Sequence, residues 1–332
     1  MGGGLPLRVL FLGTPDFAVP TLHSLLASRH GVAGVLTRRD RPAGRGAHPL
    51  PAPVKTAALA AGLPLLQPAR VNSEPTYAAI RALAPDVAVV VAFGCLLSPE
   101  FLVLPPRGCI NVHASLLPAY RGAAPIARAI MAGEVRTGVT TMRMERGLDT
   151  GDILLSRACE IGTLETAGEL TSRLADLGAG LLLETIEAQA RDALRPTPQD
   201  ATQATVAPSL TRQDGVIDWN DSAQAVACRV RGCNPWPLAT AGLRGKRVQI
   251  LRAAEIAAAQ GPGAGRDHGG GVPSPPGRVV EADKGRVIVV CGEGSRLSLL
   301  ELCFPGGRAI RALDALNGRL VLHDDHFTSP PA

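Results

Sequence analysis

The sequence predicts an α/β protein with an open, mostly parallel sheet, followed by a small β-rich domain. In the first half of the 332 residues, short apolar stretches alternate with helix-like stretches. Repeated β-α-β order is typical of a parallel sheet covered by helices. After about Ala193 the pattern changes to a polar, proline-bearing stretch and then to short strand-like runs. The length also fits two domains of roughly 100–200 residues each.

The expected strands of the first domain are short and apolar. Asp86–Phe93 is almost continuously apolar, as expected for a parallel strand buried on both faces. Thr166 and Glu169 have the spacing of a capping box, which predicts a helix with leucines at helical spacing behind it. The other expected elements are strands at 8–13, 32–36, 109–112 and 138–144, a helix ending near 27 and a helix at 54–61.

The second half predicts a linker and a β-rich domain. We expect a first domain at 1–193, a linker at 194–209 and a second domain at 210–332. Residues 257–277 are rich in Gly and Pro, which predicts a surface loop. The expected strands of this domain are 245–251, 278–280, 286–290 and 297–302.

The composition excludes several classes of protein. Hydrophobic residues make up 46% and charged residues 19%, which is enough for a packed core. No apolar run approaches the ~20 residues that cross a bilayer, and the first strand starts too early for a leader. We therefore expect a soluble, cytoplasmic protein. Seven scattered cysteines predict free thiols and no metal site.

The net charge of +5 is carried by 31 Arg and only 3 Lys. This charge is compatible with a polyanionic partner, but spread over 332 residues it does not establish one.

The first catalytic candidates lie in GCINVHASLLPAYRGAAP at 108–125. On a strand, Asn111 and His113 share a face, with Cα atoms ~6.6 Å apart from a rise of ~3.3 Å per residue. A carboxamide can donate to a developing oxyanion, and an imidazole can move a proton near its pKa of ~6.5. In open α/β sheets, ligands bind at the carboxyl ends of strands, where this pair is expected. The spacing alone is more often that of a structural His and Asn.

A second candidate is the turn GLDTGD at 147–152. Asp149 and Asp152 could orient a histidine, but Asp residues among glycines more often form turns. The glycine after the first strand, Gly13, belongs to neither a Gly-x-Gly-x-x-Gly nor a P-loop pattern, so no dinucleotide site is predicted.

Residues 38–55 form a basic stretch with five cations, one anion and several Pro and Gly. Such a loop can bind a nucleic-acid backbone, and it can equally be a solvated surface loop.

Together these segments resemble the methionyl-tRNA formyltransferase family, and the resemblance spans nearly the whole chain. Asn-x-His-x-Ser-Leu-Leu-Pro with a later Gly-Leu-Asp-Thr-Gly is shared by the wider group of folate formyltransferases. The downstream Asp-Trp and Asn-Pro-Trp-Pro motifs and the basic loop are specific to the tRNA enzymes. The motifs are RVLFLGTPDFAVP at 8–20, DRPAGRG at 40–46, GCINVHASLLPAYRGAAPI at 108–126, GVTTMRMERGLDTGDIL at 138–154, IDWNDSA at 217–223 and RVRGCNPWPLA at 229–239.

The resemblance implies transfer of a formyl group from 10-formyltetrahydrofolate to the α-amine of methionine on initiator tRNA. It implies a Rossmann-like formyltransferase fold followed by an OB-like β-barrel. The implied catalytic residues are Asn111, His113 and Asp149, with no metal. The implied folate-binding residues are Ser115, Leu116, Leu117 and Pro118, with Phe93 and Gly94 as a weaker inference.

The resemblance also implies that the basic loop and the second domain bind tRNA. Ala47 and His48 stand where family members commonly carry lysines, so we expect a weaker contribution of the loop to RNA affinity. A monomer in the bacterial cytoplasm is expected. The expected RNA-binding residues are Arg38, Arg39, Arg41 and Arg45 in the loop and Arg229, Arg231, Arg244, Lys246 and Arg247 in the second domain.

Two other functions remain open. The first is a folate formyltransferase that acts on a nucleotide-sugar amine or a purine precursor, which would keep the catalytic residues but would not need the basic loop or the second domain. The second is a non-catalytic tRNA-binding protein on a decayed enzyme scaffold.

Overall fold

The chain divides into two compact units, each described here by itself. The computed structural model describes residues 4–43, 48–256, 274–283 and 286–331, without the side chains of 41–43, 48, 49 and 283. The first unit contains 1–125, 136–160 and 171–207, and the second contains 126–135, 161–170 and 208–332. Arg45, Ala47 and residues 257–273 of the expected surface loop lie outside the described residues.

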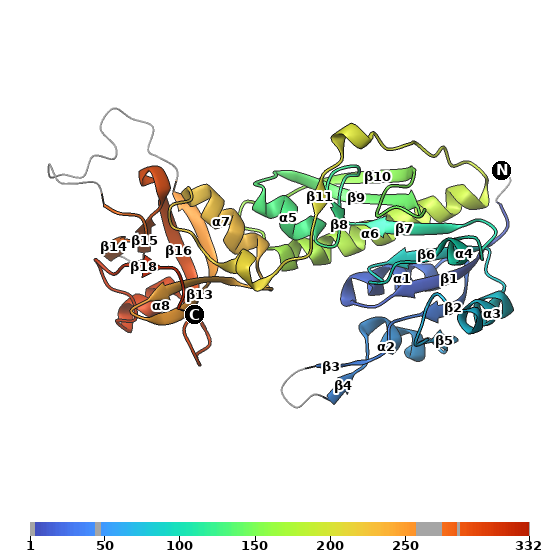
Figure 1. Ribbon diagram of the computed structural model, residues 1–332, viewed down its shortest axis with the longest axis horizontal. Helices are drawn as coiled ribbons and strands as arrows, with labels where there is room; N and C mark the ends of the chain where they lie inside the picture. Colours follow the sequence, from blue (N-terminus) through green and yellow to red (C-terminus); the bar gives the residue numbers. More distant parts are fainter. Residues whose placement is uncertain (1–3, 44–47, 257–273, 284–285, 332) are drawn as a thin grey trace. The chain divides into compact units, whose positions relative to one another are not determined.

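The first unit is built on a seven-stranded sheet in the order β10-β9-β7-β6-β1-β2-β5 (Figure 1). The five strands from β7 to β5 are parallel, and β9 and β10 are antiparallel to their neighbours. The predicted α/β fold with a mostly parallel sheet is therefore confirmed. The strands are β1 Arg8–Gly13, β2 Gly31–Leu36, β5 Leu65–Leu66, β6 Val87–Val91, β7 Cys109–His113, β9 Arg136–Arg143 and β10 Ile153–Glu160.

The centre of this sheet is its most apolar part. All five residues of β6 are buried, as the continuous apolar run predicts. Alternate residues of β1, Leu10 and Leu12, pack in one cluster with Ile80 of α3 and Phe101 of α4. The helices of this unit are α1 Val19–Leu26, α2 Pro53–Ala60, α3 Glu74–Leu83, α4 Pro99–Leu102 and most of α6 Ala167–Ala190, with 3-10 turns at Asp16–Ala18 and Ala201–Gln203.

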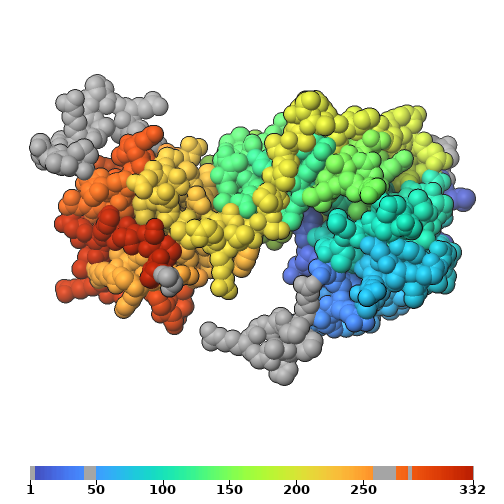
Figure 2. Space-filling view, viewed as in Figure 1, coloured from blue at the N-terminus to red at the C-terminus, as the bar shows by residue number. Residues whose placement is uncertain are grey.

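Short strand pairs lie outside the main sheet. Within the basic stretch, β3 Arg41–Ala43 pairs with β4 His48–Leu50 in an antiparallel hairpin that the sequence did not predict. β8 Arg121–Gly122 pairs with β11 Val206–Ala207 in parallel. Of the predicted linker at 194–209, residues 194–207 belong to the first unit and run along its outside (yellow in Figure 2).

The helix α6 begins at the predicted capping box. The backbone N–H of Thr166 donates to Glu169 Oε2 at 2.8 Å, and the backbone N–H of Glu169 donates to Thr166 Oγ1 at 3.3 Å. Midway along the helix, Gly178 fits against the sheet, where a Cβ would lie 3.0 Å from Val112.

An ion-pair network joins the end of α6 to the start of β2. The fully buried His30 ring accepts the N–H of Leu7 at Nδ1, so its Nε2 carries the proton and donates to Glu187 at 3.0 Å. Arg29 adds two hydrogen bonds to the same carboxylate, of 2.8 and 2.7 Å. These Arg29 hydrogen bonds lower the pKa of Glu187 from its ordinary value of 4.5 to about 2, against the opposing effect of burial.

The variant Glu187→Gln should destabilise the first unit by about 1 kcal/mol at pH 7, because a neutral amide accepts weaker hydrogen bonds from Arg29. A carboxylate with a lowered pKa stabilises the fold above about pH 4.5, and this stabilisation is lost as the pH falls towards about 2. The difference from wild type should therefore shrink between about pH 5 and 3. Native-state hydrogen exchange of β1 and β2, corrected for intrinsic rates, measures it. A difference in unfolding free energy that stays constant with pH would contradict the prediction. The control is Glu184→Gln, on the exposed face of the same helix.

The second unit is a curled antiparallel sheet that packs on helices. The strand order is β14-β15-β16-β13-β12-β18, with β17 paired to β16. A bridge between Arg278 and His326 brings the segment before β18 back to β14, so the sheet closes on itself. This confirms the predicted barrel-like second domain. Its elements are α5 Pro125–Met131, α7 Ala223–Gly232, β12 Ala239–Leu243, β13 Lys246–Ile256, β14 Val279–Asp283, β15 Arg286–Val290, β16 Arg296–Cys303, β17 Ala309–Arg311, α8 Ala312–Asn317 and β18 Phe327–Thr328, with 3-10 turns at Arg212–Gly215 and Gly292–Gly294.

All seven cysteines are free, as predicted. Within the described ranges, no helix is both long and apolar enough to cross a membrane.

Candidate active site

The candidate site is formed where β7 ends. Side chains alternate along this strand, so Asn111 and His113 face one side and Val112, which lies against α6, faces the other. His113 is 6% exposed, whereas Asn111 is half-buried. None of the described residues hydrogen-bonds the Asn111 carboxamide, which leaves its N–H groups available for a substrate oxygen.

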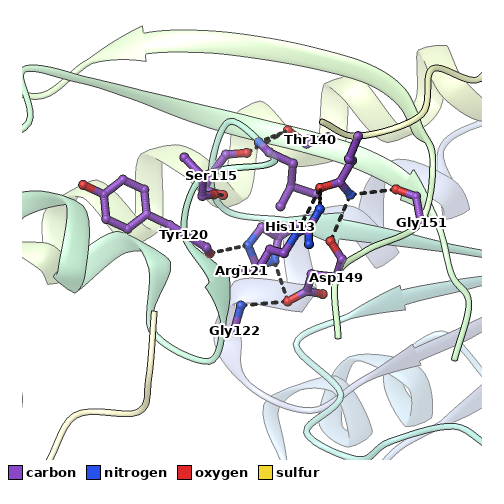
Figure 3. A network of polar contacts seen from close by, with 11 residues as sticks. His113, Ser115, Tyr120, Arg121, Gly122, Thr140, Asp149 and Gly151 are labelled. Carbon is purple, nitrogen blue, oxygen red and sulfur yellow. Dashed lines mark hydrogen bonds and ion pairs between the residues drawn. The ribbon is translucent and has the colours of Figure 1, made fainter. Parts of the chain in front are cut away.

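The His113 ring lies between two acceptors (Figure 3). Its Nε2 is 2.9 Å from the carbonyl oxygen of Tyr120, and a carbonyl can only accept, so Nε2 carries a proton. Its Nδ1 is 3.6 Å from Oδ2 of Asp149, whose side chain is 13% exposed. A proton gained at Nδ1 would therefore lie against a carboxylate that little water screens. The structure thus brings together two residues that are 36 positions apart in sequence.

Asp149 is held in place by its own contacts. Its Oδ2 accepts the backbone N–H of Gly122 at 2.9 Å. The residue lies in the turn between β9 and β10 with φ of 54°, in the left-handed region that Asp tolerates better than most residues. Its carboxylate is therefore fixed between the N–H of Gly122 and the imidazole of His113.

The segment after β7 is a compact turn that is buttressed by β9. Thr140 Oγ1 donates to the carbonyl of Ser115 at 2.8 Å and accepts the N–H of Leu117 at 3.2 Å. Ser115 is fully buried and its hydroxyl donates to the carbonyl of Ala119 at 2.6 Å. Of the expected folate-binding residues in this turn, Leu116 and Pro118 are half-buried, and Ser115 and Leu117 are buried.

The two other expected folate-binding residues lie in different environments. Phe93 is 2% exposed and packs in the core cluster behind β6, so its ring is not at the surface of the site. Gly94 is exposed with φ of 75°, and its carbonyl accepts a hydrogen bond from Arg38 at 3.0 Å.

Of the cations expected to bind RNA at the basic stretch, Arg38 and Arg39 precede β3. Arg38 is held by Gly94, and Arg39 approaches the carbonyl of Gln67 at 3.5 Å. Arg41 is the first residue of β3, and Arg45 lies outside the described residues. Asp40 accepts hydrogen bonds from Lys55 and Gln67, and the Lys55 contact lowers its pKa. The base of the hairpin is thus fixed by an ion pair.

The cations of the second unit fall into two groups. Arg231 is only 9% exposed and donates to the carbonyls of Gly162 and Glu165, so its guanidinium serves packing within this unit. Arg229 likewise donates to the carbonyl of Asp214 and to the carboxylate of Asp221. The other group surrounds the turn from β12 to β13: Arg244, which is paired with Asp325, Lys246 and Arg247, all exposed.

Several residues at the site were not assigned from the sequence. Gly122 and Tyr120 contribute backbone groups, and no sequence pattern shows which backbone atom meets a distant side chain. Thr140 belongs to a strand that was predicted, but its hydroxyl contacts were not. Gln199 donates to the carbonyls of Asp149 and Gly151 from within the predicted linker.

Similarity to known proteins establishes the family of this chain. Residues 7–186 match the formyl transferase family, and 209–320 match the formyl transferase C-terminal domain. The methionyl-tRNA formyltransferases of Xanthomonas axonopodis pv. citri and Moorella thermoacetica are 46% and 47% identical, over 94% of this chain and 98% and 96% of theirs. The solved N-formyltransferase of Helicobacter canadensis, in complex with folinic acid and dTDP-3-aminofucose, shares the fold with a TM-score of 0.64 at 15% identity, over 88% of this chain and 98% of that one. The chain therefore belongs to the methionyl-tRNA formyltransferase family.

Proposed function

We propose that this enzyme transfers the formyl group of 10-formyltetrahydrofolate to the α-amine of methionine on initiator tRNA. The main support is the identity of about 46% to methionyl-tRNA formyltransferases over 94% of the chain. Buried His113, the half-buried Asp149 that it faces and the available Asn111 can supply the chemistry that such a transfer needs. We further propose that it acts as a monomer in the bacterial cytoplasm; for the bacterial location, the support is that its relatives are bacterial enzymes.

The reaction exchanges one C–N bond for another. The amine attacks the formyl carbon, and the C–N bond to the methionine forms as the bond to N10 breaks. The amine loses a proton, N10 gains one, and tetrahydrofolate leaves. Asn111 donates to the oxygen that becomes negative in the tetrahedral transition state. His113 stabilises that oxygen or carries the amine proton, and Asp149 orients the ring and balances its charge. The formyl group on N10 is already activated, so the proposal needs no metal and no covalent enzyme intermediate.

The folate is proposed to lie against the turn at 115–118. Leu116 and Pro118 offer partly exposed apolar surface next to the polar residues of the site. Ser115 and Leu117 are proposed to shape this turn from within, since both are buried. Gly94, which is exposed, is proposed to lie at the wall of the pterin pocket, and Phe93 is proposed to support this segment from the core. The tRNA is proposed to bind Arg38, Arg39, Arg41 and Arg45 and the exposed cations Arg244, Lys246 and Arg247.

The decisive assay is formyl transfer from 10-formyltetrahydrofolate to methionine-charged initiator tRNA, with charged elongator tRNA as the control. Strong preference for the initiator would support both the chemistry and the proposed RNA recognition. Hydrolysis of the folate without transfer to either tRNA would indicate a different amine acceptor, such as a nucleotide sugar. Binding of tRNA without turnover would indicate a decayed enzyme.

The variant Arg41→Ala should lower kcat/KM for the charged tRNA by about 10-fold, because a phosphate contact by arginine is lost. The KM for the folate should stay within about twofold. Steady-state kinetics with each substrate varied in turn measures both, and the effect on tRNA should weaken as salt is raised. Arg70→Ala, at an exposed arginine outside the basic stretch, is the control. Unchanged tRNA kinetics would remove this residue from the proposed RNA contacts.

A further inference from the structure

The segment from Thr197 to Ala207 is bound along the catalytic unit at both of its ends. Thr197 exchanges two backbone hydrogen bonds of 2.9 Å with Ile153 at the start of β10. At the other end, Val206–Ala207 pairs with Arg121–Gly122. Gly122 is the residue whose N–H contacts Asp149, so the segment ends next to the site.

Gln199 connects this segment to the turn that carries Asp149. Its Nε2 donates to the carbonyl of Asp149 at 2.9 Å and to that of Gly151 at 2.7 Å. Its Oε1 accepts from Nε and Nη2 of Arg121, at 3.1 and 2.7 Å. Both donors and both lone pairs of the carboxamide are therefore used, which is the full hydrogen-bonding capacity of a glutamine side chain.

Thr205 contacts the residue on the other side of the histidine. Its Oγ1 accepts the backbone N–H of Tyr120 at 2.8 Å, and its carbonyl accepts the N–H of Arg121 at 2.9 Å. The carbonyl of Tyr120 is the one that accepts from Nε2 of His113. One segment thus bonds to both residues that flank the imidazole.

Both of these residues have unusual backbone angles. Asp149 has φ of 54° and Tyr120 has φ of 60°, in the left-handed region that residues other than glycine seldom adopt. Such conformations persist where several contacts with the surrounding structure hold the backbone in place. Gln199 and Thr205 supply hydrogen bonds of that kind. The segment does not need these two side chains for its own attachment, because its backbone is already paired at Thr197 and at Val206–Ala207.

We infer that Gln199 and Thr205 are positioning residues for formyl transfer, which hold Asp149 and the Tyr120 carbonyl at the two nitrogens of His113. This inference rests on the proposed function, because it assumes that His113 and Asp149 are catalytic. The segment predicted as a linker is then part of the catalytic apparatus. Neither side chain touches a substrate; each acts through a residue that contacts the imidazole.

The variants Gln199→Ala and Thr205→Val should lower kcat by about 30-fold and about 10-fold, because small displacements of catalytic groups cost up to about 100-fold. The KM values for the folate and the tRNA should stay within about threefold. Gln199→Glu separates the contacts, since it can still accept from Arg121 but cannot donate to the two carbonyls; it should lose nearly as much as Gln199→Ala. Gln199→Glu also tests the inference if Gln199→Ala does not fold.

The segment offers matched controls. Gln203 is exposed and its carboxamide donates to Asp200, and Thr202 is exposed and also bonds Asp200. Gln203→Ala and Thr202→Val should keep kcat within about twofold of wild type. Equal losses in the controls would mean that any change in this segment reduces activity, and they would overturn the inference.

A double-mutant cycle separates positioning from a general structural role. Asp149→Asn keeps a side chain that can accept from Gly122 but removes the carboxylate. If Gln199 acts by placing that carboxylate, adding Gln199→Ala to Asp149→Asn should cost less than about threefold in single-turnover transfer. A full additional 30-fold loss in this background would overturn the inference. If Asp149→Asn and His113→Ala kept wild-type activity, the proposed site would be wrong and the inference would fall with it. If those two variants lost activity while Gln199→Ala and Thr205→Val stayed within threefold, the inference alone would be wrong.

Discussion

Replacing His113 by alanine should lower formyl transfer by at least about 1,000-fold, while affinity for tRNA stays within a few-fold. The imidazole is 6% exposed and sits between the carbonyl of Tyr120 and the carboxylate of Asp149, where it can both donate a hydrogen bond and carry a proton. General acid–base groups contribute about 10²–10⁴-fold, and loss of electrostatic stabilisation of the oxyanion adds to this. Removal of the ring also leaves the carboxylate of Asp149 without the imidazole that it faces.

Two measurements test this prediction. Single-turnover transfer to charged initiator tRNA reports the chemical step, and filter binding of the same tRNA reports affinity. His23→Ala is the matched control, because His23 is exposed on α1 in the same unit and has no part in the site. Transfer by His113→Ala within tenfold of wild type would show that the mechanism is wrong.

The parts of the fold that the sequence predicts are those set by local patterns. β1 and β6 are apolar enough to be recognised at once, and both form the buried centre of the sheet. The capping box at Thr166 and Glu169 forms as expected, because its bonds join residues three apart. The β3–β4 hairpin was missed, because Pro and Gly dominate that stretch and conceal any strand pattern.

The candidate site is only partly visible in the sequence. Asn111 and His113 can be placed together, since a strand alternates its side chains. That Asp149 reaches the same ring depends on how β9 and β10 turn, which is not a local property. The positive charge of an arginine also does not show whether its side chain lies on the surface. Arg231 was expected to contact RNA, but it lies inside the second unit and donates to carbonyls there. The sequence does not reveal the contacts of Gln199 either. A polar, proline-bearing stretch predicts a linker whether or not one of its side chains is hydrogen-bonded to the rest of the unit.

Replacing Gly122 by alanine should lower transfer by about 100-fold with only a modest loss of stability. Gly122 has φ of 123°, an angle that strains any residue with a Cβ. A Cβ there would also lie 2.7 Å from the carbonyl oxygen of Ala207, closer than Cβ atoms in proteins approach other heavy atoms. The chain must therefore shift at 122, and the shift breaks the pairing with Ala207 or moves the N–H away from Asp149.

The cost of this change falls mainly on catalysis. A strained backbone angle costs about 1–3 kcal/mol when the fold retains it. The pairing of β8 with β11 is short, so the chain can relieve the strain by breaking this pairing. Loss of this pairing displaces the carboxylate of Asp149. The position of that carboxylate matters only in the transition state, so kcat should fall while the KM for either substrate changes little. Gly62→Ala separates the two effects, because Gly62 has φ of 65° and open space around its Cβ position. That control should cost about 1 kcal/mol in unfolding free energy and leave kcat unchanged. A Gly122→Ala enzyme that transfers formyl groups within threefold of wild type would mean that the N–H of Gly122 does not fix Asp149, and that the carboxylate is held by the turn between β9 and β10 alone.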